Sequence, residues 1–505
     1  MPVDYDLVVI GSSAAGIHAA IAAANLKARV ALVEQGRSAI GDEFGVRVLT
    51  EVGQAIYQRQ WGASLGLWDA TAPLATTLWT QAKQWSEAAA IAITDPLSPS
   101  ALSALGIDVL SGCGEFHRKP VPGFRVNGRS LRSRAYLLAI EQLPVVLESS
   151  IQQPSNPISP TVSEPALSEI DGLATIGYLN ASAVLEKIPT LETPQRLVIM
   201  GNDTIGVALA QSLVRLGQTV TLIVSTPTIL PHEDPEAALL LQAQLEAEGV
   251  EVVTGTTVTQ VRQIEQSKWV QAGNRAIEAD EIVLATVPTF VWETLNLEAV
   301  NVKRSPLGVW VNAKLQTTNP RIYACRGHIA GAYASQQAIA DVAIALKNAL
   351  FWPIAKIPPY PVPSVISTAP PLARIGHTEP SAMQRFGKNV VVLRQPFKTL
   401  VKAHIQDETT GFCKLLVHRN GTLLGAHIVG AQADELIGTI ALAMQQKLKI
   451  QAIAALVLPS SVFAQIIHKA AAEWHHQRWQ QHTSRQDFWE RFFNWRRSVD
   501  RGDRG

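Results

Sequence analysis

Cysteine is scarce in this chain of 505 residues, and its scarcity excludes several kinds of chemistry. The three cysteines, Cys113, Cys325 and Cys413, are far apart and form no CxxC or Cys/His pattern. They argue against a disulfide framework and a zinc site, and we expect no metal centre. Each cysteine is interpreted as a small buried hydrophobic residue. The low count is typical of a reducing compartment, so we expect a cytoplasmic protein.

Neither sign of charge is in excess, and the apolar runs are short. The formal net charge of +1 gives no general attraction to a polyanion, so we expect no nucleic-acid partner. The apolar stretch of residues 7–24 is broken by Gly11, Gly16 and His18, which argues against a membrane span. No basic segment precedes it, so we expect no signal peptide. A length of 505 residues with 47% hydrophobic content fits roughly three domains.

What the chain does contain is a strand, a glycine turn, a helix and a second strand within residues 4–34. Residues 7–10 are a short apolar run of β-branched character, and residues 17–26 carry alanine and isoleucine at helical spacing. Residues 30–33 form the second strand. This order predicts a βαβ unit, around which the rest of the chain is organised.

The turn and the strand end of this unit carry a dinucleotide-binding fingerprint. Gly11 makes the turn, Gly16 lets the helix pack on the strand, and Glu34 is placed to hold a ribose hydroxyl. The middle glycine of the fingerprint is replaced by Ser13, a small residue that adds a hydroxyl donor. The alternative is a βαβ unit that binds no nucleotide, with Glu34 simply solvated.

The same pattern recurs in residues 196–224. Gly201 and Gly206 bracket the second turn, but Asp203 puts a carboxylate where a pyrophosphate would lie. The second strand ends in Val224, followed by serine and threonine rather than by an acid or an arginine. Neither NAD nor NADP is therefore favoured at this unit. Asp203 is expected instead to cap the following helix.

The remaining segments are interpreted from composition and periodicity. Residues 36–45 are expected to form a loop, followed by helix-prone sequence to about residue 90 and by a strand at residues 106–112. Residues 144–172, rich in proline, serine and glutamate, predict a surface linker. The last part predicts an antiparallel α+β domain with a helix at residues 434–447. Its strands are expected at residues 390–393, 400–405, 412–418 and 423–429.

Two dinucleotide-binding units followed by such a domain resemble the pyridine nucleotide-disulfide oxidoreductases, which include dihydrolipoamide dehydrogenase, mercuric reductase and the soluble transhydrogenases. The resemblance runs from about residue 4 to residue 472 and is close at residues 319–324 (NPRIYA), 372–376 (LARIG) and 411–436. It implies an α/β fold with two Rossmann-like FAD/NAD(P)-binding domains and a C-terminal α+β dimerisation domain. It also implies FAD in the first unit, NAD(P)H in the second, and a homodimer.

The implied domain boundaries follow from the resemblance. They are an FAD-binding-like domain in residues 1–150 and 291–355, a linker in 151–190, an NAD(P)-binding-like domain in 191–290, a dimerisation domain in 356–472 and an aromatic, basic tail in 473–505.

The residues that carry the family's chemistry are mostly replaced. The segment after Glu34 holds no cysteine, although the family's redox pair belongs there, and thiolate chemistry needs sulfur. The family's glutamate that pairs with a lysine is Ala208 here. Its His-Pro-x-x-x-Glu motif falls on residues 458–463, where Leu458 and Phe463 cannot carry a proton. We therefore predict no catalytic residue and no disulfide reductase activity.

The flavin site is better preserved, so we expect FAD. Its candidate cofactor-binding residues are Gly11, Ser12, Ser13, Ala14, Ala15, Gly16, Glu34, Gly114, Ala139, Gly327 and His328. The family's Ala-Thr-Gly motif is Ala139, Ile140 and Glu141, which adds bulk and negative charge. The family's second flavin aspartate is missing, and Arg326 or His328 is predicted to offer phosphate a donor instead.

Two functions fit this sequence. The first is an FAD-binding oxidoreductase without dithiol chemistry and with a weakened NAD(P) site. The second is a non-catalytic dimeric scaffold that has lost both cofactors and attaches to a membrane surface or a protein partner through the tail. The tail places Phe488, Phe492 and Trp495 on one helix side, with arginines nearby, which suits a peripheral membrane contact or a partner groove. Packing of this helix on its own protein is the favoured interpretation.

Overall fold

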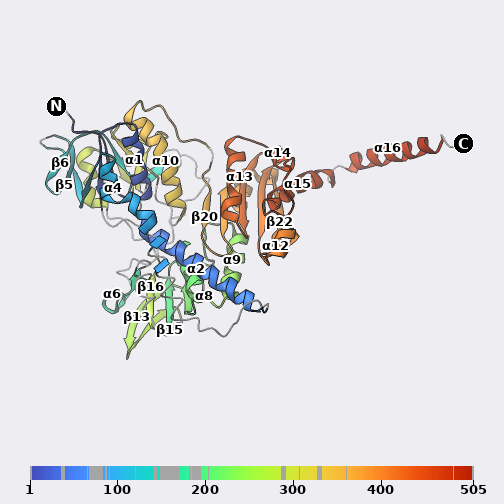
Figure 1. Cartoon of the computed structure of the whole chain (residues 1–505), viewed down its shortest axis with the longest axis horizontal. Coiled ribbons are helices and arrows are strands. Elements are labelled where there is room, and N and C mark those ends of the chain that lie inside the picture. Colours follow the sequence, from blue (N-terminus) through green and yellow to red (C-terminus); the bar gives the residue numbers. More distant parts are fainter. Residues whose placement is uncertain are drawn as a thin grey trace. The chain divides into compact units, whose positions relative to one another are not determined.

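The computed structural model divides the chain into two compact units, Met1–Ala369 and Pro370–Gly505 (Figure 1). It describes residues 3–35, 40–64, 66, 84–85, 88–89, 91–119, 121–140, 145–147, 170–180, 183–184, 195–202, 204–285, 292–305, 308–326, 332–359, 361–480 and 483–502.

A five-stranded parallel sheet with the order β19-β7-β1-β2-β3 forms the centre of the first unit. Its strands are β1 (Tyr5–Ile10), β2 (Val30–Glu34), β3 (Ile107–Ser111), β7 (Ser133–Leu138) and β19 (Ile322–Ala324). Residues 7–10 of the central strand have no exposed surface, as expected for a strand covered on both faces of a parallel sheet. The predicted βαβ unit is confirmed by the parallel pairing of Leu7 with Val30 and of Ile10 with Val33.

Small side chains bring the first helix close to this sheet. Helix α1 (Ala14–Asn25) buries Ala15, Ala19, Ala20 and Ala23, and it lies beside α10 (Ala332–Leu350) (Figure 1). Helix α4 (Pro99–Ala104) packs on β3. The interior of this layer is apolar and closely packed, and it positions the helix N-terminus and the strand ends.

The second parallel sheet, with the order β12-β11-β10-β16-β9, repeats this plan. Its elements are β9 (Leu179–Asn180), β10 (Arg196–Met200), α8 (Thr204–Arg215), β11 (Thr219–Ile223), α9 (Pro235–Ala247), β12 (Glu251–Val253) and β16 (Glu281–Leu284). Helix α8 begins at Thr204, as the sequence predicts. Asp203, its expected cap, lies outside the described residues.

Shorter strands and short helical elements complete the first unit. They are β4 (Gly114–His117), β5 (Gly123–Val126), β6 (Arg129–Leu131), β8 (Val145–Leu147), β13 (Val258–Ile264), β14 (Ser267–Ala272), β15 (Arg275–Ala279), β17 (Arg304–Ser305), β18 (Gly308–Val311), β20 (Ser364–Ile366), α6 (Leu173–Ile176), η1 (Asp95–Leu97), η4 (Trp292–Leu295) and η5 (Leu297–Val300). Strand β8 pairs in parallel with β18, so the prediction that residues 144–172 are all linker is wrong for these three residues. Three valine and leucine residues in a row favour that strand despite the linker-like composition around them.

Helix α2 (Ile40–Ser64) corrects another prediction. Residues 40–45 belong to this helix of 25 residues, although their glycines favoured a loop. A glycine costs a helix only about 1 kcal/mol. Packing of α2 along α8 outweighs that cost.

The second unit is an antiparallel sheet flanked by helices, as predicted. Its strands β21 (Leu372–Gly376), β24 (Leu423–Val429), β23 (Phe412–His418) and β22 (Val390–Pro396) are neighbours in that order. Its helical elements are α11 (Glu379–Phe386), η6 (Gly387–Asn389), η7 (Phe397–Thr399), α12 (Val401–Ile405), α13 (Ala433–Gln445), α14 (Ile450–Ala454), α15 (Gln465–Gln480) and α16 (Thr483–Gly502). Helix α13 confirms the helix expected at residues 434–447.

The strand expected at residues 400–405 is wrong, because the segment forms the short helix α12. Leu400 and Ala403 are buried at helical spacing, whereas the β-branched Val401 and Ile405 are 60% and 68% exposed. The imidazole of His404 bonds the carbonyl oxygen of Lys398, which closes the turn. These tertiary contacts override the β propensity of valine and isoleucine.

The tail begins within α15, where Trp474 is buried, and continues as helix α16, whose aromatic side chains are largely exposed. Phe488 is 60% and Trp495 62% exposed. The favoured interpretation of the tail, a helix packed on its own protein, is therefore wrong for these side chains.

Candidate dinucleotide site

The first glycine turn lies at the carboxyl end of β1 and leads into the N-terminus of α1. Ser13 is the N-cap of that helix, and its hydroxyl oxygen accepts from the backbone N–H of Gly16 at 3.2 Å. The same hydroxyl donates its only proton to the carbonyl oxygen of Ala139 at 2.6 Å. The hydroxyl that the sequence predicts as a donor is therefore used within the protein, and contact of Ser13 with a cofactor stays a prediction. Helix geometry leaves the first-turn amides of Ala14 and Ala15 for an external acceptor.

The bracketing glycines are required by packing alone. A Cβ atom on Gly11, whose φ is +110°, would collide with the carbonyl oxygen of Ala139 and lie 2.9 Å from the Cα of Ile140. A Cβ atom on Gly16 would collide with the carbonyl oxygen of Gly11. Both glycines thus hold β1, α1 and the end of β7 together, whether or not a nucleotide binds.

Glu34 ends β2 at the same edge of the sheet. The Ser111 hydroxyl, at the end of the neighbouring strand β3, donates to its carboxylate and fixes its direction. A carboxylate at this place is suited to accept ribose hydroxyls.

Gly114 lies just beyond β3 and is held by a side chain. Gln35 donates to its carbonyl oxygen at 3.0 Å and accepts from its backbone N–H at 3.2 Å. Both polar groups of Gly114 are occupied within the protein, so its contact with a cofactor stays a prediction.

The end of β7 lines the far side of the turn. Ala139 and Ile140 are both buried in the core of the first unit, with Ile140 8% exposed. Glu141, Gly327 and His328 lie outside the described residues.

Arg326 does not extend toward a phosphate position. Its guanidinium donates to the Asp341 carboxylate at 2.8 and 2.6 Å, and its backbone N–H donates to the same group at 2.9 Å. Asp341 lies on α10 and is 1% exposed. The predicted role of Arg326 as a phosphate donor is therefore wrong, because a buried carboxylate already binds this cation.

Taken as a cofactor site, the described residues fit the nucleotide end of FAD. The helix N-terminus can take a pyrophosphate, and Glu34 can take a ribose. Ser13 and Arg326, the two further donors expected here, are occupied by protein acceptors.

In the second dinucleotide-binding unit, the three residues after β11 include no carboxylate comparable with Glu34. Strand β11 ends at Ile223, and Val224, Ser225 and Thr226 follow. The side chain of Asn202 donates to the Thr226 hydroxyl and accepts from the backbone N–H of Leu230. These bonds tie the loop after β11 to the second glycine turn. Val224, Ser225 and Thr226 include neither a carboxylate nor an arginine.

Helices α2 and α8 contact each other where the family has its lysine–glutamate pair. Ala208 is buried, and the polar contacts come one and two helical turns later. Thr50 shares a hydrogen bond of 3.3 Å with Ser212, and Arg215 donates to Gln54 at 2.5 Å. The pair of helices is therefore held by a network that sequence comparison did not predict.

Arg215 is the centre of this network. It forms a bidentate ion pair with Glu248 at 2.7 Å for both bonds, and the two side chains are only 5% and 6% exposed. Its guanidinium also lies 4.6 Å from the ring centroid of Tyr57, and it donates to the carbonyl oxygen of Ala369. A planar guanidinium can stack on an aromatic ring and pair with a carboxylate through two bonds at once, which a lysine ammonium cannot do.

The thiols are placed apart and differ in exposure. Cys113 is exposed, whereas Cys325 and Cys413 are buried and unpaired. Burial raises the pKa of both buried thiols far above the ordinary value, so neither forms a thiolate at neutral pH.

Titration with a thiol-specific disulfide reagent at neutral pH should modify only Cys113 in the native protein. All three cysteines should react after denaturation, because unfolding ends the burial that raises the pKa of Cys325 and Cys413 and shields them from the reagent. A Cys113→Ser variant, the control, should show no fast-reacting thiol. Rapid native modification of more than one thiol would contradict this picture.

The positions of the family's His-Pro-x-x-x-Glu motif are apolar and serve packing. Phe463 is 2% exposed, and its ring centroid lies 6.0 Å from that of Phe397. The ammonium of Lys402 lies 4.9 Å from the same ring. Phe463 thus belongs to the core of the second unit, and neither it nor the half-buried Leu458 can exchange a proton.

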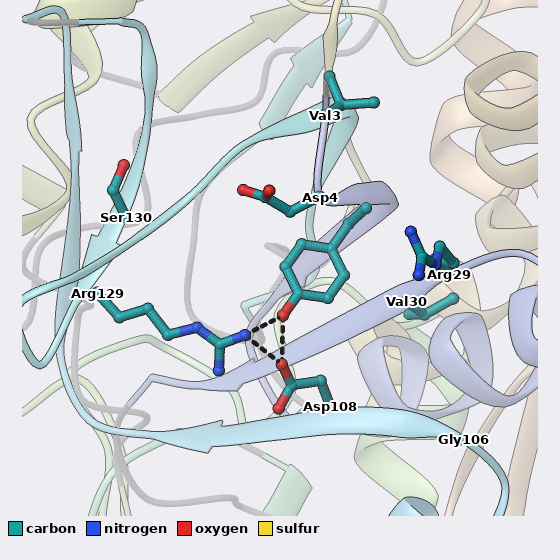
Figure 2. Close-up of a pocket in the computed structure, with 9 residues that line it drawn as sticks. Val3, Asp4, Arg29, Val30, Gly106, Asp108, Arg129 and Ser130 are labelled. Atoms are coloured by element: carbon teal, nitrogen blue, oxygen red, sulfur yellow. Dashed lines mark hydrogen bonds and ion pairs between the residues drawn. The ribbon is translucent and has the colours of Figure 1, made fainter. Parts of the chain in front are cut away.

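A polar pocket of about 590 Å³, which the sequence did not indicate, opens at the opposite edge of the first sheet, where β1, β2 and β3 begin (Figure 2). It is lined by Val3, Asp4, Tyr5, Arg29, Val30, Gly106, Asp108, Arg129 and Ser130. The Tyr5 hydroxyl donates to Asp108, and Arg129 donates to both. Burial and the Asp108 carboxylate raise the pKa of Tyr5 to about 12. These charges satisfy one another, and we assign the pocket no function.

The described part of the chain was also considered for a membrane-spanning helix and a metal-binding cluster. None of its helices has both the length and the hydropathy that crossing a bilayer requires. No group of three or more His, Cys, Asp or Glu side chains among those residues is placed to hold a metal ion.

Comparison with known proteins extends this picture. The family model of the pyridine nucleotide-disulphide oxidoreductases matches residues 159–349, and the model of that family's dimerisation domain matches residues 362–471. The mercuric reductase of Staphylococcus aureus is 30% identical over 460 residues, which cover 89% of this chain and 78% of that protein. A dihydrolipoyl dehydrogenase of Bacillus subtilis is 32% identical over 282 residues, covering 55% of this chain and 61% of that one.

The fold has a close counterpart among solved structures. The HOCl-induced flavoprotein disulfide reductase RclA from Escherichia coli superposes with a TM-score of 0.73 at 20% identity, covering 93% of this chain and 99% of that chain. The two parallel sheets, the antiparallel C-terminal domain and the sequence matches agree. The chain belongs to the pyridine nucleotide-disulphide oxidoreductase family.

Proposed function

We propose that this protein is an FAD-binding oxidoreductase that works without a dithiol. The observation that carries the proposal is the arrangement at the carboxyl edge of the first sheet, where the α1 N-terminus and the Glu34 carboxylate are held as a nucleotide needs them. Electrons would pass directly between flavin and a small acceptor or a protein. The three dispersed cysteines support the absence of a dithiol step.

The proposal includes a weakened nicotinamide site. Its support is the second dinucleotide-binding unit, where Val224, Ser225 and Thr226 offer no carboxylate to a ribose. Asn202 also ties the glycine turn of that unit to the loop after β11. We therefore propose that NAD(P)H is a poor electron donor for this flavoprotein.

The protein is proposed to work as a homodimer formed through residues 356–472. The matched dimerisation domain at residues 362–471 supports the homodimer. Exposed apolar side chains in the same unit, Leu442 at 58% and Val457 at 97%, are suited to the interface.

A non-catalytic dimeric scaffold is the second candidate. It is favoured by the occupation of Ser13 and Arg326 by Ala139 and Asp341, because a protein that has abandoned a cofactor is free to use its donors internally. This candidate predicts a colourless protein that takes up no flavin.

Visible absorption of the purified protein, followed by anaerobic addition of NADH or NADPH, is expected to show a flavin band that bleaches slowly or not at all. Glu34→Ala should weaken FAD binding by about tenfold or more, the loss of a charged hydrogen bond. Asp108→Asn, a carboxylate change at the opposite edge of the same sheet, should leave FAD binding unchanged.

Each other result decides against part of the proposal. A protein that neither contains nor takes up FAD would sink the oxidoreductase and favour the scaffold. Rapid bleaching of the flavin band by NADH or NADPH would show that the second dinucleotide-binding unit still binds its nucleotide. Equal FAD affinity of the Glu34→Ala variant and the unaltered protein would remove Glu34 from the site.

A further inference from the structure

Helix α16 presents an exposed cluster of aromatic side chains that the flavin chemistry does not use. The cluster consists of Phe488, Trp489, Phe492, Phe493 and Trp495, whose rings contact one another with centroids 5.5 to 6.0 Å apart. Trp489 is 40% and Phe493 48% exposed. Large aromatic side chains gathered on one exposed helix face mark an interaction surface.

Polar side chains occupy the other side of the same helix. At 3.6 residues per turn, Asp487, Glu490 and Asn494 fall opposite Phe492. Over residues 487–497, α16 is therefore an amphipathic helix with an aromatic face and an opposite polar face.

Arginines border the aromatic cluster. Arg491 and Arg497 fall at its two edges, and Arg496 falls within it, beside Phe492 and Trp489. The Arg497 guanidinium donates to the carbonyl oxygen of Phe493 at 3.2 Å and to Asn494 at 2.8 Å. Cations therefore surround the apolar side chains that would be buried on binding.

This combination matches a helix that lies in a membrane interface. Such helices join an aromatic or apolar face to arginine-rich borders, and their overall hydropathy is too low for a span. We propose that α16 lies flat in the headgroup region of a membrane that carries anionic lipids. The aromatic rings enter the acyl boundary, and the arginines bind lipid phosphates.

Charge decides between a membrane and a second copy of this helix. Two α16 helices pairing through their aromatic faces would bring the two Arg496 side chains into the same apolar interface, which like charge and desolvation oppose. On a bilayer, the same arginine extends its charged end to the lipid phosphates while its stem stays beside the rings. An anionic surface therefore complements this face better than another α16 does.

Sedimentation with lipid vesicles tests the proposal on the full-length protein. Binding is expected to vesicles of phosphatidylcholine mixed with phosphatidylglycerol, and to be much weaker with phosphatidylcholine alone. Raising the salt concentration should weaken binding, because salt screens the arginine–phosphate attraction.

Variants separate the aromatic and basic contributions. The triple variant Phe488→Ser/Phe492→Ser/Trp495→Ser should lose at least about tenfold in vesicle affinity. Arg491→Gln, Arg496→Gln and Arg497→Gln should each cost about fivefold. The matched control is Phe351→Ser/Trp352→Ser, because these aromatics are 56% and 73% exposed outside α16 and should not affect vesicle binding.

Three results would overturn the proposal. The first is no sedimentation with the mixed vesicles at low salt. The second is unchanged binding by the triple aromatic variant, with circular dichroism showing that it is folded. The third combines two observations: the unaltered protein does not bind vesicles, and light scattering shows a lower particle mass when the aromatics are replaced. That result would assign the aromatic face to contact with a second copy of the protein.

Discussion

Gly11→Ala is expected to lower the free energy of unfolding by roughly 3 kcal/mol or more, and to abolish flavin binding with it. The added methyl would meet the backbone of Ala139 and Ile140, which belongs to the sheet core and cannot move aside, and the φ of +110° is strained for alanine. Chemical denaturation followed by circular dichroism measures the loss.

A second glycine provides the matched control for this prediction. Gly106 also has a positive φ, of +82°, but no atom lies within 4 Å of the position of its added Cβ. Gly106→Ala should therefore cost only the backbone strain, about 1 kcal/mol. Equal losses in both variants would mean that the close approach of Gly11 to Ala139 does not matter. The fingerprint glycine would then owe its place to the nucleotide alone.

Glu248→Ala is expected to destabilise the first unit by about 3 to 5 kcal/mol. The change leaves the Arg215 guanidinium, 5% exposed, without its bidentate partner, and Gln211 and Gln244 lose an acceptor on the same carboxylate. Thermal or denaturant unfolding of the full chain measures the effect. The physical reason is that the buried Arg215 guanidinium loses its counter-charge, since its other bonds go to the neutral groups of Gln54 and Ala369.

The chain offers an exposed ion pair for comparison. Arg275 and Glu251 are 51% and 49% exposed, so Arg275→Ala should cost under about 1 kcal/mol. A double change of Arg215→Met and Glu248→Leu should recover much of the loss, because it removes both charges together. If Glu248→Ala cost no more than Arg275→Ala, the buried Arg215–Glu248 pair would stabilise the first unit no more than an exposed ion pair does.

These two predictions bear on function in different ways. Gly11 tests whether the flavin-like turn is built for packing, for a nucleotide or for both. Glu248 tests the buried network around Arg215, which also contacts α2 through Gln54. Helix α2 contains most of residues 38–51, the cysteine-free segment that matches the family's redox-cysteine segment. A structural contact of α2 with Arg215 agrees with the proposed absence of dithiol chemistry.

The sequence by itself determined the architecture. Apolar runs at strand spacing, glycine turns and alanine-rich helices repeat within about thirty residues in both dinucleotide-binding units, and local pattern is sufficient to specify a βαβ unit. The strands at residues 412–418 and 423–429 were predictable for the same reason. The missing cysteines and the replaced acid/base pair were also visible, because loss of a chemical group needs no fold to be recognised.

Only the tertiary structure decided how the remaining polar groups are used. The hydroxyl of Ser13 bonds a carbonyl 126 positions along the chain, which the sequence did not indicate. Arg326 bonds a carboxylate on α10 and was wrongly expected to face phosphate. The helix at residues 401–405 and the exposure of the α16 aromatics likewise depend on what packs beside them. Hydrogen-bond partners and burial are set by contacts between distant segments, and a local sequence pattern contains no information on which distant group will be the neighbour.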